Sequence, residues 1–363
     1  MKVGILTFHD ADNYGAVLQA YALQETVKKI EKDVNIINYK QPFIIKGYRI
    51  IKINTRNVKS FAKSLVFTLA HLYNRSIRKR KFSTFRRKYL ELSEPIWKSI
   101  EIKGWDAYIV GSDQIWNGNN TLYDKTFFLS FCLKNKKRIA YAASIGKDIR
   151  TEKDRGFIEK NIHHIDYISV REDSAKEILR NFTDKEIIHV LDPSLLADRS
   201  IWDELIYEHR EIYKRKYLFL YNIPRNEEIF RIANHISKKL NLPVIYMNNS
   251  IRNNPYGFRK IKGAGPEEFL TFIKNASFVV TNSFHCTAFS IVFNRNFITL
   301  PTNRSTTRMS SLLALLKLEN RLIRDFNEIK DDYQTEIDYT IPNELLKEEK
   351  EKSFSFLRQS LEG

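Results

Sequence analysis

The chain has 363 residues, 43% of them apolar and 13% aromatic, which is enough for two packed cores at roughly 100–200 residues per domain. This composition excludes a disordered, collagen-like or disulfide-rich protein, while two cysteines and twelve glycines argue against a zinc cluster and a glycine-rich nucleotide loop. Because no apolar run reaches the length of a signal peptide or a membrane-spanning helix, we expect a cytoplasmic protein.

The formal net charge of +17 comes mainly from one segment, residues 41–90, which holds fourteen basic and no acidic residues. Apolar residues that a helix could present on one side lie between these charges: Val66, Phe67, Leu69, Leu72 and Tyr73. Three interpretations stay open, namely a helix on an anionic membrane surface, a phosphate-binding surface for nucleic acid, and a solvated helical insertion. The sequence lacks the known nucleic-acid-binding motifs, which disfavours the second.

Short apolar runs alternate with helical patterns along the chain, beginning with a run at 3–8, a polar loop at 9–13 and a helical pattern at 14–30. Further strands are expected at 107–110, 138–144, 167–170, 187–191, 217–221, 243–246 and 277–281. Continuous apolar strands between helices predict parallel sheets covered on both faces.

A polar, helical stretch at 197–216 separates two such series. It predicts a domain at 1–196, with a basic helical insertion at about 41–100, and a domain at 197–363 that ends in a charged helix from residue 343. In open α/β sheets, ligands bind beyond the carboxyl ends of the strands, where helix N-termini offer free N–H groups. We therefore expect an anion site in the cleft between the domains.

His285 has the best position of the eight histidines, because it falls on the first turn of the helix that follows the strand at 277–281, beside the predicted caps Asn282 and Ser283. The helix end should lower the pKa of an unliganded histidine, and a bound phosphate should raise it, so His285 could become an acid once an anion arrives. A histidine satisfied in the core is the alternative. The neighbouring Cys286 points elsewhere on the helix and is interpreted as a core residue.

Two more candidates follow strands of the first series. Asp113 could act as a base or bind a substrate hydroxyl, or it could cap a helix. Arg171 could clamp a carboxylate bidentately, or it could pair with Glu172 or Asp173. No metal-ligand constellation stands out, so we expect no metal.

Seven motifs, in order between residue 3 and about residue 320, together resemble the polysaccharide pyruvyl transferase family. They are GILTFH at 4–9, NYGAVLQ at 13–19, GSDQIWN at 111–117, YAAS at 141–144, ISVRE at 168–172, LDPS at 191–194 and TNSFH at 281–285. The resemblance implies a GT-B-like fold, in which two Rossmann-like, doubly wound domains face a central cleft. Many members carry Arg two positions before the motif histidine, where this chain has Ser283; Arg308, which resembles another family arginine, is the expected substitute.

The resemblance also implies phosphoenolpyruvate as the donor substrate, with no separate cofactor, and a cyclic pyruvate ketal formed on two hydroxyls of a sugar with release of phosphate. His285 would be the acid or a phosphate partner, and Asp113 would take the hydroxyl proton. The predicted substrate-binding residues are Arg171 for the carboxylate, Arg308 and Ser283 for the phosphate, and Asn13, Tyr14, Gln114 and Asn282. We expect a galactose-type acceptor, lipid-diphosphate-linked or polymeric, in capsular or exopolysaccharide synthesis.

A lipid-linked acceptor would explain the basic segment as a contact with the anionic inner face of the cell membrane, with no nucleic acid involved. Two rival functions stay open. One is a nucleotide-sugar-dependent glycosyltransferase of the same fold, and the other is a non-catalytic module that binds nucleic acid or membrane.

Overall fold

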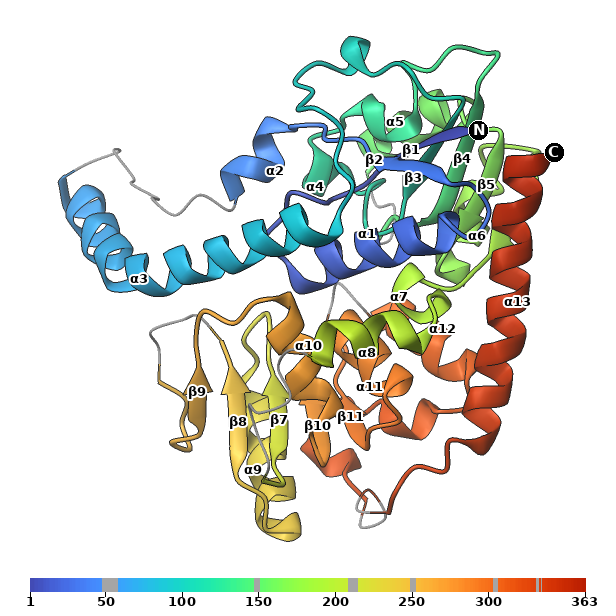
Figure 1. Ribbon diagram of the computed structural model, residues 1–363. Coiled ribbons are helices and arrows are strands. Elements are labelled where there is room, and N and C mark those ends of the chain that lie inside the picture. Colours follow the sequence, from blue (N-terminus) through green and yellow to red (C-terminus); the bar gives the residue numbers. More distant parts are fainter. Residues whose placement is uncertain are drawn as a thin grey trace.

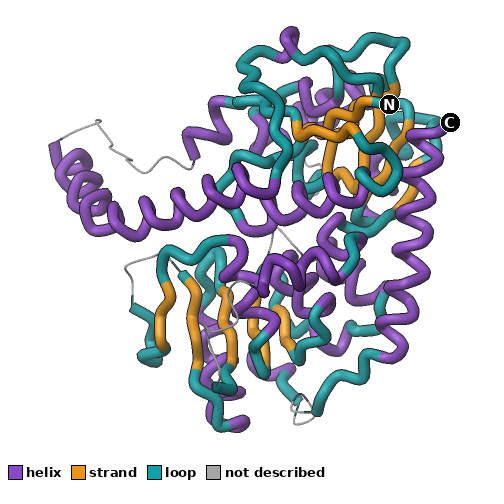
Figure 2. Tube along the Cα trace, viewed as in Figure 1, coloured by secondary structure: helices purple, strands orange, loops and turns teal. Residues whose placement is uncertain are grey.

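The computed structural model describes residues 1–47, 58–146, 151–207, 215–248, 253–302, 306–330, 333 and 335–363. Two parallel sheets lie in two halves of the molecule, with helices between and around them (Figures 1 and 2). The expected α/β class and two doubly wound halves are confirmed.

The first sheet has six parallel strands in the order β2-β1-β3-β4-β5-β6. Their bounds are β1 Lys2–Leu6, β2 Asp33–Ile36, β3 Ala107–Gly111, β4 Lys137–Ala143, β5 Tyr167–Val170 and β6 Ile187–His189. Successive residues of β3 belong to different cores: Ile109 packs in one apolar cluster and Val110 in another. Both faces of the sheet are thus covered, which explains why its strands read as unbroken apolar runs.

Helices cover this sheet and lead from it toward the second one. They include α1 Tyr14–Val27, α5 Glu152–Ile162, α6 Asp173–Leu179, the short α7 Pro193–Leu196 and α8 Arg199–Tyr207. α1 begins eight residues after β1 ends, and α7 begins four residues after β6 ends. Both helices therefore start near the carboxyl edge of the sheet, on the side that faces the other half.

The second sheet has five parallel strands in the order β11-β10-β7-β8-β9. Their bounds are β7 Leu218–Tyr221, β8 Val244–Met247, β9 Arg259–Ile261, β10 Phe278–Thr281 and β11 Phe297–Thr299. The helices of this half are α9 Glu227–Leu240, α10 Pro266–Lys274, α11 Phe284–Val292 and α12 Thr306–Leu315. α10 has favourable residues at its start, with Pro266 in the first turn and two acidic residues at the positive end of the helix dipole.

The C-terminal helix α13, Thr340–Glu362, returns to the first half of the molecule (Figure 1). Ser353 accepts a hydrogen bond from the backbone N–H of Leu191 at 2.9 Å, and Phe356 lies 6.3 Å from the ring of Tyr141 in β4. Chain order assigns this helix to the domain at 197–363, but it packs on the first domain, because Phe356, Leu357 and Leu361 share an apolar cluster with Tyr141 of β4 and Leu195 of α7. The chain therefore returns from the second domain to the first near its C-terminus.

The basic segment forms α2 Pro42–Gly47 and the long helix α3 Val58–Tyr89. The last turns of α3 are anchored, since Phe82 and Phe85 are fully buried, while Leu72 and the 75%-exposed Tyr73 face solvent. The side chains of Val66, Phe67 and Leu69, part of the predicted apolar set, lie outside the described residues. Within the described ranges, no helix combines the length and apolarity needed to cross a bilayer.

Candidate active site

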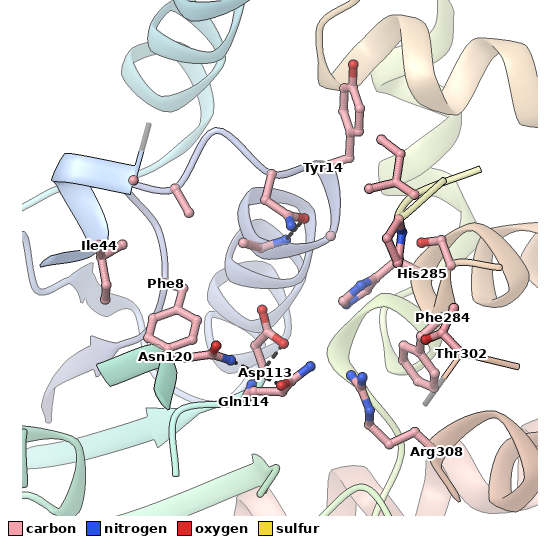
Figure 3. Close-up of a pocket in the computed structure, with 18 of the residues that line it drawn as sticks. Phe8, Tyr14, Ile44, Asp113, Gln114, Asn120, Phe284, His285, Thr302 and Arg308 are labelled. Carbon is pink, nitrogen blue, oxygen red and sulfur yellow. Dashed lines mark hydrogen bonds between the residues drawn. The ribbon is translucent and has the colours of Figure 1, made fainter. Parts of the chain in front are cut away.

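A pocket of about 860 Å³ lies between the two domains (Figure 3). Eight of the nine residues predicted as site residues line it: Asn13, Tyr14, Asp113, Gln114, Asn282, Ser283, His285 and Arg308. They come from the loops and helix starts that follow β1, β3 and β10, and from α12. The predicted cleft site at the carboxyl ends of the strands is therefore present, and Arg171 is the predicted residue that does not border it.

Ser283 caps α11 as predicted. Its hydroxyl accepts a hydrogen bond from the N–H of Cys286 at 3.5 Å, and its carbonyl oxygen accepts one from Thr287 at 3.0 Å. Cys286 is buried at the core side of the helix, and burial raises the pKa of its thiol to about 12, so it is no nucleophile.

Asn282 lines the pocket, but its side-chain amide makes its hydrogen bonds with other protein groups. Oδ1 accepts a hydrogen bond from the N–H of Ile223 at 2.8 Å, and Nδ2 donates to the carbonyl of Pro224 at 2.8 Å and to Oδ1 of Asn222 at 3.2 Å. The sequence predicts Asn282 as a second cap of α11, but it instead holds the turn at 222–224 against the end of β10.

His285 points from α11 across the pocket toward the first domain (Figure 3). The residue is 9% exposed, and its Nε2 is buried with no hydrogen-bond partner among the described residues. The ring lies against α1, where a Cβ on Gly15 would be 2.0 Å from Nδ1. Only glycine fits at position 15 with this ring orientation, and a histidine satisfied in the core is not what the structure shows.

The charge state of His285 depends on four neighbours. Burial lowers its pKa, Asp192 and Asp113 act in the opposite direction, and Arg171 and Arg308 lower the pKa further. The net effect is a pKa below the ordinary value, so the imidazole is neutral at pH 7 when the pocket is empty.

Asp113 sits in a tight loop that leaves β3. Gly111 has φ 126° and its Cα lies so close to β4 that a Cβ would be 2.0 Å from the carbonyl oxygen of Tyr141. Asp113 itself has φ 69°, in the left-handed region that few residues other than glycine occupy. The cap of the next helix, α4 Gly118–Thr121, is Asn117, so the helix-cap alternative for Asp113 is wrong.

The Asp113 carboxylate accepts hydrogen bonds from the N–H of Gln114 at 2.8 Å and from Nη2 of Arg171 at 3.0 Å. Burial by itself would raise its pKa, but Arg171, His285 and Arg308 outweigh burial and lower it. Asp113 is therefore ionised at neutral pH and is available to accept a proton or a hydroxyl hydrogen bond.

Arg171 is fully buried behind the pocket rather than in its wall. Its guanidinium binds Asp192 at 2.6 Å and Asp113 at 3.0 Å, and its Nε lies 3.8 Å from Glu172. The guanidinium that the resemblance assigns to a substrate carboxylate is thus occupied by the protein's own carboxylates. Of the two neighbours weighed as ion-pair partners, Glu172 is close and Asp173 pairs instead with His189.

Asp192 is a residue of this centre that the sequence analysis did not single out. It caps α7, it is buried, and it brings Arg171 and His285 together, with its Oδ2 3.8 Å from Nε2 of His285. A local signal for it exists, because Asp followed by Pro193 and Ser194 is a typical helix start.

Arg308 borders the pocket opposite Asp113 (Figure 3). With its amide oxygen turned toward Arg308, Gln114 accepts hydrogen bonds from Nη2 at 2.9 Å and from Nη1 at 3.3 Å. The ring centroid of Phe284 lies 5.6 Å from the guanidinium carbon of Arg308 and 5.1 Å from that of Arg171. Burial lowers the pKa of Arg308 to about 10, which still leaves a cation at pH 7.

Asn13 and Tyr14 form the start of α1, and Tyr14 connects it with the second domain. Asn13 caps α1 by accepting from the N–H of Ala16 at 3.3 Å. The hydroxyl of Tyr14 donates to the carbonyl of Ala264 at 2.9 Å, and its ring stacks on Phe269 with centroids 4.5 Å apart. These two residues thus fix one wall of the pocket across the domain boundary.

In the described part of the chain, no group of three or more His, Cys, Asp or Glu side chains is arranged to hold a metal ion. The acidic and basic residues at the pocket are Asp113, His285 and Arg308, with Arg171 and Asp192 behind them. This set combines a proton carrier, a cation and a carboxylate at a helix N-terminus, as an acid–base reaction on an anionic substrate requires.

Similarity to solved structures shows the fold. A putative UDP-N-acetylglucosamine 2-epimerase from Listeria monocytogenes is 11% identical with TM-score 0.50, over 95% of this chain and 90% of that one. The Neisseria meningitidis UDP-GlcNAc 2-epimerase (8%, 99% of each chain, TM-score 0.49) and the E. coli heptosyltransferase WaaC with ADP (12%, 98% and 100%, TM-score 0.42) are also similar. The architecture is GT-B-like, with two Rossmann-like domains facing a cleft.

Comparison with curated proteins finds no match. The family model described as polysaccharide pyruvyl transferase matches residues 13–304, which include every predicted site residue except Arg308. The motifs, the fold and this match agree, and the chain belongs to the polysaccharide pyruvyl transferase family, a family of transferases.

Proposed function

We propose that the protein moves the enolpyruvyl group of phosphoenolpyruvate onto two hydroxyls of one sugar and closes a cyclic pyruvate ketal with release of phosphate. The observation that carries the proposal is His285: a buried imidazole whose Nε2 has no hydrogen-bond partner among the described residues, on the first turn of a capped helix that faces the pocket. Membership of the family supplies the reaction class, and the pocket supplies groups of the right kind.

The donor is a trianion when fully ionised, and two features suit its phosphate. The N-terminus of α11 offers backbone N–H groups and partial positive charge, and Arg308 adds a full charge at the pocket wall. A bound anion would raise the pKa of His285, because it offsets Arg308 and attracts a proton to the ring. His285 would then be an acid only when the donor is in place.

The chemistry balances with one acid and one base. His285 gives a proton to the methylene carbon of the donor, which becomes a methyl group, and the ester carbon becomes oxocarbenium-like. A sugar hydroxyl attacks this carbon and loses its proton to Asp113. The carbon–oxygen bond to phosphate then breaks, and the second hydroxyl attacks the same carbon and loses its proton. One of the two hydroxyl protons restores His285, and the other leaves with the phosphate.

The remainder of the pocket would hold the acceptor, since about 860 Å³ is more than the small donor needs. Phe8, Ile44, Asn120 and Ile223 line this region, a mixture of apolar and amide groups that suits the apolar face and hydroxyls of a pyranose. We propose a galactose-type sugar on a lipid-diphosphate-linked or polymeric precursor of a capsular or extracellular polysaccharide.

Release of inorganic phosphate from phosphoenolpyruvate, with a panel of lipid-linked and aryl galactosides, tests the proposal. We expect release that depends on an acceptor and stops when both neighbouring hydroxyls are blocked. Thermal stabilisation by uridine or guanosine diphosphate, with none by phosphoenolpyruvate, would instead support a nucleotide-sugar glycosyltransferase.

We further propose that the protein binds the inner face of the cell membrane through the basic segment 41–90. The first turns of α3 extend beyond both sheets (Figure 1), and each Lys or Arg near an anionic surface contributes about 1 kcal/mol. Flotation with anionic liposomes should therefore succeed at low salt and weaken at high salt. Absence of flotation at low salt would contradict membrane binding without affecting the proposed reaction.

A further inference from the structure

Asp192 is held at both carboxylate oxygens beside His285. Oδ1 accepts hydrogen bonds from the N–H and the hydroxyl of Ser194 at 3.0 and 2.6 Å. Oδ2 accepts from Nη1 of Arg171 at 2.6 Å and from the hydroxyl of Ser112 at 3.1 Å. Burial by itself would raise the pKa of Asp192, but His285 and Arg171 lower it to about 2. Asp192 is thus a fixed negative charge at neutral pH.

His285 reaches this carboxylate from the other domain. Its Nε2 lies 3.8 Å from Oδ2 of Asp192, about 1 Å longer than a charge-assisted hydrogen bond. On its other side the ring packs against Gly15. A small movement of the ring toward Asp192 would give the buried Nε2–H an acceptor that it otherwise lacks among the described residues.

The arrangement of the other charges near His285 leaves the carboxylate of Asp192 as the main group that favours the protonated ring. Arg171 is paired with Asp192 and Asp113, so much of its charge is already compensated. Arg308 lines the pocket, where an anionic ligand would offset its charge. Once the anion is bound, Asp192 and Asp113 are the charges that favour the protonated ring, and Asp192 is the one that faces Nε2.

We propose that Asp192 is a positioning residue for His285, which holds the Nε2–H of the protonated ring and leaves Nδ1 to carry the proton that goes to the substrate. Asp192 is not among the residues that line the pocket. Because α7 and α11 belong to different domains, the acid is complete only when the domains lie as they do here. The substrate in this inference rests on the proposed function, but the pairing itself does not.

Titration of His285 in the full-length protein without donor tests the pairing directly. The ring signal is followed by NMR after labelling of histidine and is assigned with His285→Gln. Asp192→Asn keeps the shape and the helix cap, since Asn and Asp cap equally well, but removes the charge. We expect it to lower the pKa of His285 by about one unit or more, as loss of an opposite charge within 4–6 Å should.

Two further variants keep the test independent of folding defects. Ser194→Ala removes a donor to Oδ1 and leaves the charge, so the titration should stay as in the wild type. Ser112→Ala removes a competing donor to Oδ2, so the pKa of His285 should rise. An unchanged titration in both Asp192→Asn and Ser112→Ala would overturn the proposal.

The pH dependence of turnover separates positioning from a structural role. Protonated His285 is the active acid, so activity falls as pH rises through its pKa in the donor complex, and Asp192→Asn should move this fall to lower pH. A merely structural residue would lower activity equally at every pH, which would contradict the assignment. If the titration responds but phosphoenolpyruvate is not consumed by the wild type, the pairing stands and the proposed function fails.

Discussion

The two helices whose N-termini border the pocket, α1 and α11, begin in the same way but differ in the residue at the second position. Each follows a buried parallel strand, each is capped by a short polar side chain, and each has an aromatic residue at its first position, Tyr14 in α1 and Phe284 in α11. At the second position α1 has Gly15 and α11 has His285, and the ring of the histidine lies against the glycine. One helix start supplies the chemical group and the other supplies the space for it.

The aromatic residues at the two helix starts contact the opposite domains. Tyr14 of the first domain stacks on Phe269 of the second, and Phe284 of the second lies over Arg171 of the first. Both contacts bury apolar surface across the cleft and fix the two helix ends relative to each other. The site is therefore a property of the pair of helices, because neither helix start alone positions His285.

The largest expected effect is on α11. His285→Gln keeps a polar side chain of similar size and removes the acid, so kcat for phosphate release should fall by about 100-fold or more. The thermal unfolding midpoint of the variant serves as the control and should stay near that of the wild type. Unchanged turnover in a folded variant would show that the histidine is not the acid.

A substitution at Gly15 of α1 tests whether the ring of His285 needs the space that this glycine leaves. Gly15→Ala adds a Cβ that would lie 2.0 Å from Nδ1, so the ring must move, and we expect roughly a tenfold or greater loss of kcat, since small displacements of catalytic groups are costly. Elsewhere in a helix the same substitution stabilises by about 0.5–1 kcal/mol.

Gly156→Ala in α5 is the control for that experiment, because a Cβ there meets nothing within 4 Å. We expect Gly156→Ala to raise the free energy of unfolding and leave turnover as in the wild type. If Gly15→Ala has the same two effects, His285 does not depend on α1 and the comparison is wrong.

Much of the framework follows from the sequence, because the central strands are buried on both faces. β1, β3, β4, β5, β7 and β10 coincide with predicted apolar runs to within two residues. The strands that the sequence analysis missed, β2, β9 and β11, lie at the edges of their sheets. β2 and β9 are partly exposed and contain charged residues, and β11 has only three residues, so none of them gives the unbroken apolar run that the central strands give.

The site was predictable where it depends on local position and not where it depends on distant contacts. Ser283, His285 and Asp113 follow strands, and a residue after a parallel strand lies at the ligand edge of the sheet. The partners of Arg171 come from positions 58 and 21 residues away, at Asp113 and Asp192. No spacing in the sequence indicates that these carboxylates occupy the guanidinium, or that Gly15 makes room for His285.

The two polar residues before α11 should differ in their effect on stability. Asn282→Ala removes three hydrogen bonds that hold the turn at 222–224 and leaves buried partners unsatisfied, which should cost about 1–3 kcal/mol or more. Ser283→Ala removes a long cap hydrogen bond of 3.5 Å and should cost about 0.5–1 kcal/mol. Urea unfolding measures both, and an equal loss would mean that the three hydrogen bonds of Asn282 contribute no more to stability than the single cap hydrogen bond of Ser283.

A similarly small effect is expected at the first position of α1. Tyr14→Phe keeps the ring on Phe269 and removes the hydrogen bond from the hydroxyl to the carbonyl of Ala264, so the free energy of unfolding should fall by about 0.5–1.5 kcal/mol. Because this bond joins the two domains beside the pocket, the variant should also raise KM for the donor more than it lowers kcat. Tyr217→Phe, which removes a hydrogen bond to the carbonyl of Phe272 within the second domain, is the matched control and should lower stability without changing KM. A KM that changes equally in both variants would mean that the link between α1 and the second domain does not shape the pocket.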